Sequence, residues 1–119
     1  MENQSWPRLV KEHSALFDQT LLQGNCEFFF EIGQGWQNIL EHICSDIDEL
    51  TNAERNNFQF QQIKEKWGAL RIYSSGGSQL TDDILERAEE LSLITCDVCG
   101  VKGHLREQGW LRVRCDAHA

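Results

Sequence analysis

Two helical stripes of apolar residues occur in this chain, one over residues 36–50 and one over residues 84–91. After Trp36 the first stripe continues at Ile39, Leu40, Ile43, Ile47 and Leu50, with acidic residues on the other side. The second stripe comprises Ile84, Leu85, Ala88 and Leu91. Thr81 precedes it as the expected N-cap, and Asp82 and Asp83 would lie in the first turn, where the helix dipole favours negative charge. The pattern predicts two main helices, and the spacing makes Trp36 a core residue.

Between the two stripes the period of the pattern changes to two. Phe58 and Phe60 alternate with glutamines, and Leu70 and Ile72 alternate with Arg71 and Tyr73. This predicts two strands joined near residues 67–68. Upstream, residues 26–32 are apolar and favour either a buried strand or an irregular loop, and the three consecutive Phe residues are expected in the core. Residues 7–17 predict a short helix with Pro7 in its first turn.

Together these elements predict an α+β fold: a small antiparallel sheet, two main helices and a C-terminal hairpin packed on the body. We expect one domain, residues 1–119, with an acidic body over 1–95 and an integral metal-binding end over 96–119. The chain has 119 residues, of which 40% are hydrophobic and 25% charged, as in ordinary soluble globular domains. The second helix reaches Cys96 with almost no linker, so the end should pack on the body.

The C-terminus carries four metal-ligating residues in two pairs. Cys96 and Cys99 form one Cys-x-x-Cys pair, and Cys115 and His118 close the chain as Cys-x-x-His. Three thiolates and one imidazole at these spacings are typical of a structural Zn²⁺ site, in which the protein fills all four tetrahedral positions. Between the pairs, residues 104–114 predict a hairpin that turns at Gln108-Gly109. The expected cofactor is therefore one structural Zn²⁺.

The same four residues allow other interpretations. The four ligands could be unrelated thiols or a redox pair, although a redox Cys-x-x-Cys usually opens a helix after a strand. His104 is a substitute ligand in principle, but Cys115-x-x-His118 has the tighter spacing and His104 is expected at the surface. Cys26 and Cys44 remain outside the set and are expected to be buried thiols.

Charge is distributed unevenly. The formal net charge is −8, with +1 on residues 96–119 and therefore −9 on residues 1–95. An acidic body argues against a general nucleic-acid binder, which normally carries a basic footprint. No secretory signal and no apolar run of membrane-spanning length is visible, and with reduced thiols this leads us to expect a cytoplasmic protein without membrane contact.

Several segments together resemble a family of small uncharacterised bacterial and phage proteins. They are Gly33-Gln-Gly-Trp36, the segment Ile63-Lys-Glu-Lys-Trp-Gly-Ala-Leu-Arg-Ile-Tyr73, Ala88-Glu-Glu-Leu-Ser92, Cys96-Asp-Val-Cys-Gly100, Gly109-Trp110 and Cys115-Asp-Ala-His118. The resemblance covers roughly residues 30–119 and implies the same Cys/Cys/Cys/His ligand set. It brings no established activity, and the first thirty residues lie outside it.

These observations favour a non-catalytic, zinc-stabilised protein-interaction module. The family's distribution makes an immunity protein, an antitoxin or a phage-type inhibitor of a host macromolecule attractive. No Ser/His/Asp or Cys/His arrangement shows at a recognisable spacing, so an enzyme is not expected. The alternative is nucleic-acid binding through the predicted C-terminal hairpin of residues 104–114. The candidate interaction surface for either partner comprises Lys64, Lys66, Arg71, Tyr73, Trp110, Arg112 and Arg114.

Overall fold

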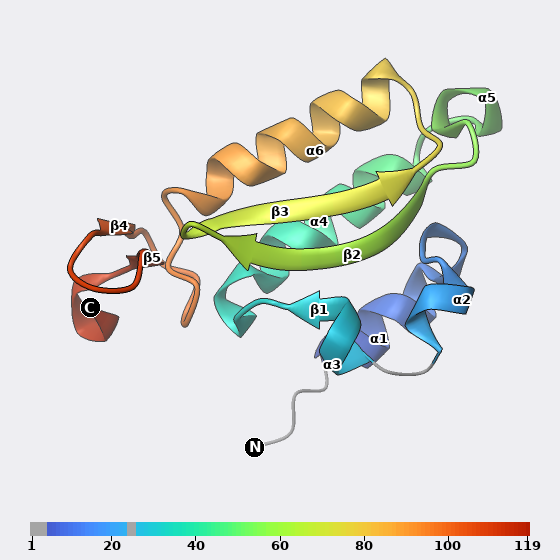
Figure 1. The fold of residues 1–119 in the computed structure, drawn as a ribbon. Helices are drawn as coiled ribbons and strands as arrows, with labels where there is room; N and C mark the ends of the chain where they lie inside the picture. The colour runs from blue at the N-terminus through green and yellow to red at the C-terminus, as the bar shows by residue number, and fades with distance from the viewer. Residues whose placement is uncertain (1–4, 24–25) are drawn as a thin grey trace.

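The computed structural model describes residues 5–23 and 26–119 (Figure 1). The helices are α1 (Ser5–Glu12), α2 (Gln19–Leu22), α3 (Cys26–Phe29), α4 (Gln37–Asp48), α5 (Asn52–Arg55) and α6 (Gln79–Ser92). The strands are β1 (Phe30–Glu31), β2 (Gln59–Lys66), β3 (Ala69–Ser75), β4 (His104–Arg106) and β5 (Arg112–Arg114). Short 3-10 helices occur at η1 (Ser14–Leu16), η2 (Gln34–Trp36) and η3 (Asp116–His118). The expected α+β fold class is confirmed.

The larger sheet is built on the β2–β3 hairpin. Lys66 pairs with Ala69 across a two-residue turn, and both turn residues, Trp67 and Gly68, have positive φ. The predicted hairpin and its turn are therefore confirmed. β1 joins in parallel, with Phe30 opposite Ile63, so the sheet order is β1-β2-β3. This parallel edge was not foreseen, because a two-residue strand is too short to leave a periodic signal.

The two main helices pack against each other beside this hairpin. α6 runs along β3, and α4 passes behind the strands in the view of Figure 1. The predicted stripe of α4 is buried at Ile39, Leu40, Ile43 and Ile47. Trp36 is fully buried, which agrees with the expectation of a core residue. The β4–β5 hairpin lies at the end of the sheet beside the β2–β3 turn, and α5 lies at the opposite end.

The N-terminal half differs in detail from the expected elements. The helix expected over residues 7–17 ends at Glu12, because His13 leaves helical geometry at φ −129° and ψ 40°, and η1 follows. Residues 26–32 form neither a full strand nor a loop, but one helical turn followed by β1. Phe29 and Phe30 are buried and contact Phe17, as expected for core residues. The side chain of Phe28 lies outside the described part of the chain.

The start of α6 requires a correction. Ser78, not Thr81, is the N-cap: its side chain accepts from the Thr81 amide, and the Thr81 hydroxyl accepts from the Ser78 amide. Thr81 is thus the third helical residue of a capping box, and only Asp82 of the two acidic residues lies in the first turn. The capping box from Thr51 to Glu54 also starts α5, which the sequence analysis missed although the Thr-x-x-Glu signal is present.

Side chains of α6 complete the free edge of β3. The Leu70 amide donates to Ser92 Oγ at 3.0 Å, and the Ile72 amide donates to Glu89 Oε2 at 3.2 Å. Both Ser92 and Leu70 are fully buried. An edge strand otherwise presents unpaired N–H groups, so these two bonds fix the position of α6 along the sheet and hence where it delivers Cys96.

Candidate metal centre and adjoining surface

A tight turn positions the first pair of ligands. The Gly100 amide donates to the Cys96 carbonyl at 2.9 Å, and the Cys96 amide donates to the Val101 carbonyl at 2.8 Å. Gly100 has φ +85°, a left-handed conformation that glycine adopts readily. The second pair lies after β5, where η3 brings His118 back toward Cys115. We call residues 96–119 the knuckle.

The four ligand atoms gather in one place. Those of Cys96, Cys99, Cys115 and His118 all lie within 4.8 Å of one another. Cys99 Sγ and Cys115 Sγ are 3.7 Å apart, and His118 Nδ1 lies 3.3 Å from Cys115 Sγ and 3.8 Å from Cys96 Sγ. A tetrahedral ion with ordinary Zn–S and Zn–N bonds would set about 3.8 Å between sulfurs and about 3.6 Å between sulfur and nitrogen. The group could therefore hold a tetrahedrally coordinated metal ion.

The backbone of the knuckle favours thiolate at one of these positions. Burial opposes ionisation of Cys96, but the backbone amides of Cys115, Cys99 and Val98 outweigh it and lower the pKa of this thiol to about 6. At Cys99 the Val101 amide lowers the pKa, but burial and the neighbouring sulfurs of Cys115 and Cys96 together raise it. A metal ion competes with protons for the same sulfurs.

The remaining thiols and His104 lie apart from this group. His104 is exposed on β4, as expected, and does not belong to the ligand cluster. Cys44 is buried in α4, and burial, with smaller contributions from Asp48 and Glu41, raises the pKa of its thiol. Cys26 is only partly buried, so the expectation of a buried thiol holds for Cys44 and not fully for Cys26.

Two glycines let the knuckle backbone touch the body. The Gly35 amide donates to the Asp97 carbonyl at 3.0 Å. A Cβ on Gly33 would lie 2.1 Å from the Asp97 carbonyl oxygen, and one on Gly35 would lie 2.1 Å from that of Cys96. Gly33-Gln-Gly-Trp36, one of the segments behind the family resemblance, is therefore the docking segment for the knuckle.

Arginines of the knuckle hairpin have distinct surroundings. Arg114 Nε and Asp97 Oδ1 are buried and form an ion pair at 2.5 Å, without the alignment of a hydrogen bond. Arg106 donates to the Arg114 carbonyl and to Asp116 Oδ1, and this contact lowers the pKa of Asp116. Arg112 and Arg114 flank the buried Val113 on β5. Trp110 precedes the strand in the loop between β4 and β5.

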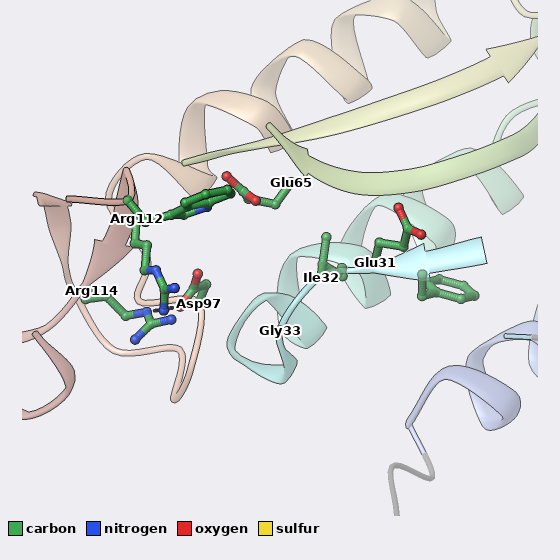
Figure 2. Close-up of a pocket in the computed structure, with 9 residues that line it drawn as sticks. Glu31, Ile32, Gly33, Glu65, Asp97, Arg112 and Arg114 are labelled. Atoms are coloured by element: carbon green, nitrogen blue, oxygen red, sulfur yellow. Dashed lines mark ion pairs between the residues drawn. The ribbon is translucent and has the colours of Figure 1, made fainter. Parts of the chain in front are cut away.

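Most of the candidate surface residues gather around two adjoining pockets. One pocket, of ≈ 470 Å³, is lined by Lys64, Glu65, Lys66, Trp67, Tyr73, Gly109, Trp110 and Leu111. The other, of ≈ 370 Å³, is lined by Phe30, Glu31, Ile32, Gly33, Glu65, Asp97, Trp110, Arg112 and Arg114. Trp110 and Glu65 belong to both. Figure 2 shows Arg112 and Arg114 reaching toward Asp97, across from Glu31 and Ile32.

Several residues that line these pockets were not among the candidates named from sequence, and Trp67 and Asp97 are the most informative of them. Arg71, a candidate named from sequence, pairs with Lys64 across the strands but lines neither pocket. Trp67, expected only as part of a turn, lines the larger pocket and is 68% exposed. Asp97 neutralises Arg114, and its proximity could not be read from sequence. A tryptophan at a two-residue turn was the signal that could have identified Trp67.

None of the described helices is long and apolar enough to cross a membrane. Comparisons with family models, with curated proteins and with solved structures return no match.

Proposed function

We propose that this chain is a non-catalytic protein-interaction module whose C-terminal end is held by a structural Zn²⁺. Thiolate and imidazole ligands suit zinc and are poor ligands for Mg²⁺ or Ca²⁺. The ligand distances support a closed tetrahedron, and four protein ligands leave no position for a reacting water. The residues that would hold the ion are Cys96, Cys99, Cys115 and His118, and its role is to stabilise the knuckle.

The groove between α4 and α6 is the observation that carries the interaction role. It has a volume of ≈ 410 Å³ and is lined by Ile39, His42, Ile43, Asp46, Leu50, Leu80, Asp83, Ile84, Arg87, Ala88 and Leu91. Leu80 and Leu91 are 44% and 42% exposed, so apolar surface remains open between the helices. An open two-helix groove of this kind accepts the apolar face of a partner helix.

Charge indicates which partner helix would fit. Two carboxylates, Asp46 and Asp83, line the groove against one cation, Arg87. The body as a whole carries −9. We therefore propose a basic amphipathic helix of another protein as the occupant, because opposite charges steer association and disfavour other partners. An immunity protein, an antitoxin or a phage-type inhibitor that occupies a basic helix of its target would use such a surface.

Affinity capture from the source cell tests this proposal when it is made dependent on the groove. The wild-type chain, the double variant Leu80→Glu and Leu91→Glu, and the control variant Trp67→Ala are used as baits. A stoichiometric partner retained by wild type and Trp67→Ala but lost by the double variant is expected. Capture of the same partner by the double variant and by wild type, or capture of no partner by any bait, would contradict the proposal. Circular dichroism should show that all three baits are folded.

A further inference from the structure

Two exposed tryptophans from different hairpins face one pocket. Trp67, at the β2–β3 turn, is 68% exposed, and Trp110, in the β4–β5 loop, is 73% exposed. Both line the ≈ 470 Å³ pocket, together with Tyr73, which is 44% exposed. Large aromatic side chains usually bury most of their surface in a folded domain. Their convergence at one pocket indicates a binding site rather than unrelated surface positions.

Packing between the hairpins sets this convergence. A Cβ on Gly68 would lie 2.8 Å from Leu105 Cδ1 and 3.4 Å from the Arg112 amide nitrogen, so the β2–β3 turn rests directly on the knuckle hairpin. The Gly68 amide donates to Glu65 Oε2 at 2.6 Å, which holds the turn. Because Trp110 lies on the knuckle, the metal ion would fix its position relative to Trp67.

Trp67 occupies its turn at a conformational cost. Its φ is +58° and that of Gly68 is +87°, so both turn residues are left-handed. Asparagine or aspartate followed by glycine is the favoured pair for such turns, whereas a bulky aromatic rarely adopts this conformation. Because the indole ring is exposed, it buries little apolar surface that could offset this conformational cost. The ring of Trp67 is therefore held in solvent, where it is open to contact with a ligand.

Three cations that form no ion pair with the described residues line the pockets at these aromatic rings. Lys64 and Lys66 line the larger pocket, and Arg112 lines the adjoining one. Within residues 5–23 and 26–119, none of the three forms an ion pair. Among the carboxylates that line the two pockets, Glu65 accepts from the Gly68 amide, Asp97 pairs with Arg114, and Glu31 is exposed. The three cations outnumber the two carboxylates that have no cationic partner in the described part of the chain, Glu31 and Glu65, so net positive charge remains for an anionic ligand.

We propose that this surface, formed by Trp67, Trp110, Tyr73, Lys64, Lys66 and Arg112, binds single-stranded nucleic acid. Unpaired bases stack on the two indole rings, and the three cations contact the intervening phosphates. Aromatic platforms interleaved with cations bind single strands in this way with little sequence preference. A duplex keeps its bases stacked inside, so their faces do not reach Trp67 and Trp110. The site is separate from the α4–α6 groove and does not depend on the protein partner proposed there.

The acidic body is compatible with this local site. In Figure 1, α6 begins at the end of the sheet away from the knuckle and ends beside it. Its fourteen residues span roughly 20 Å, which places the acidic first turn at Asp82 far from the tryptophans. Exposed charges are screened over about 8 Å at physiological ionic strength. Repulsion by the start of α6 therefore has little effect at the pocket.

Fluorescence anisotropy with a labelled oligothymidylate and an oligouridylate of about twelve nucleotides tests the proposal on the zinc-loaded full chain. Both strands should bind, and a duplex of the same length should bind more weakly. With three phosphate contacts, the logarithm of the association constant should fall with the logarithm of salt with a slope of about −2. Replacing Arg112 by Gln should reduce the magnitude of that slope by about 0.7, and Lys11→Gln on α1 is the charge-matched control.

Trp67→Asn separates binding from folding. Asparagine adopts the left-handed turn readily, so the melting temperature of this variant should be no lower than that of wild type. Its affinity for the single strand should nevertheless fall by about tenfold or more. Trp110→Ala should lose a similar factor. Absence of salt-sensitive binding by wild type, or equal binding by Trp67→Asn, would overturn the proposal. So would a protein partner that requires Trp67 while neither strand binds.

Discussion

The indole nitrogen of Trp36 donates a hydrogen bond to the backbone carbonyl of Thr95 at 2.9 Å. Trp36 is fully buried at the start of α4, and Thr95 immediately precedes Cys96, the first candidate metal ligand. This bond therefore ties the hydrophobic core to the residue just before the knuckle, over a sequence separation of 59 residues. Together with the contact of Gly35 with Asp97, it holds the candidate metal centre against the body.

Trp36→Phe should destabilise the chain by about 1 to 3 kcal/mol beyond the loss of ring volume, because the Thr95 carbonyl would lose its partner. Trp6→Phe is the matched control: Trp6 is 3% exposed, and its indole nitrogen has no hydrogen-bond partner among the described residues. Urea denaturation of both variants measures the difference. Equal losses at the two positions would show that the Trp36 hydrogen bond contributes nothing to stability.

Gly35→Ala should loosen the knuckle. The new Cβ would lie 2.1 Å from the Cys96 carbonyl oxygen and 2.8 Å from the Val98 amide nitrogen. Both are backbone atoms, so relieving the clash requires a shift of the knuckle backbone. We expect faster metal loss to a chelator and a lower melting temperature than wild type. Gly109→Ala is the control, because nothing lies within 4 Å of its Cβ position and only its positive φ of 78° opposes the change, at about 1 kcal/mol. Similar metal-loss rates in both variants would contradict the docking role of Gly35.

Cys99→Ser should abolish stoichiometric metal binding and unfold residues 96–119. In isolated zinc fingers, metal binding supplies folding free energy on the order of 10 kcal/mol. Elemental analysis should find one zinc per wild-type chain and little in the variant, and amide exchange should rise across the knuckle. Cys26→Ser lies outside the ligand cluster and should retain full zinc. Equal zinc content in Cys99→Ser and wild type would rule out the ligand assignment.

Ser92→Ala should cost about 1 to 3 kcal/mol, because the buried Leu70 amide would lose its acceptor. Ser45→Ala, on the exposed side of α4, provides the same chemical change at the surface and should have little effect. Thermal denaturation measures both. If Ser92→Ala is as stable as Ser45→Ala, the Leu70 amide must find another hydrogen-bond acceptor. The stability of the β3 edge would then not depend on the side chain of Ser92.

Sequence pattern was sufficient for the parts of this protein that depend on local spacing. The helical stripe from Ile39 to Ile47 and the Trp67-Gly68 turn follow from periodicity and turn chemistry, and both are present. The four ligand positions follow from paired short spacings, and their atoms do converge. The start of α6 was misplaced because Ser78 and Thr81 are both good capping residues, and reciprocal bonds between them decide which one is the N-cap.

Tertiary structure decided how these local units meet. Trp110, Lys64 and Lys66 could be identified from sequence as candidates, but their positions around one pocket could not. Those positions depend on the packing of Gly68 against Leu105. It contained Gly33 and Gly35 without indicating that the knuckle backbone lies against them. Local order is encoded within a few neighbouring residues, whereas these contacts join segments tens of residues apart. Packing of the whole chain alone selects them.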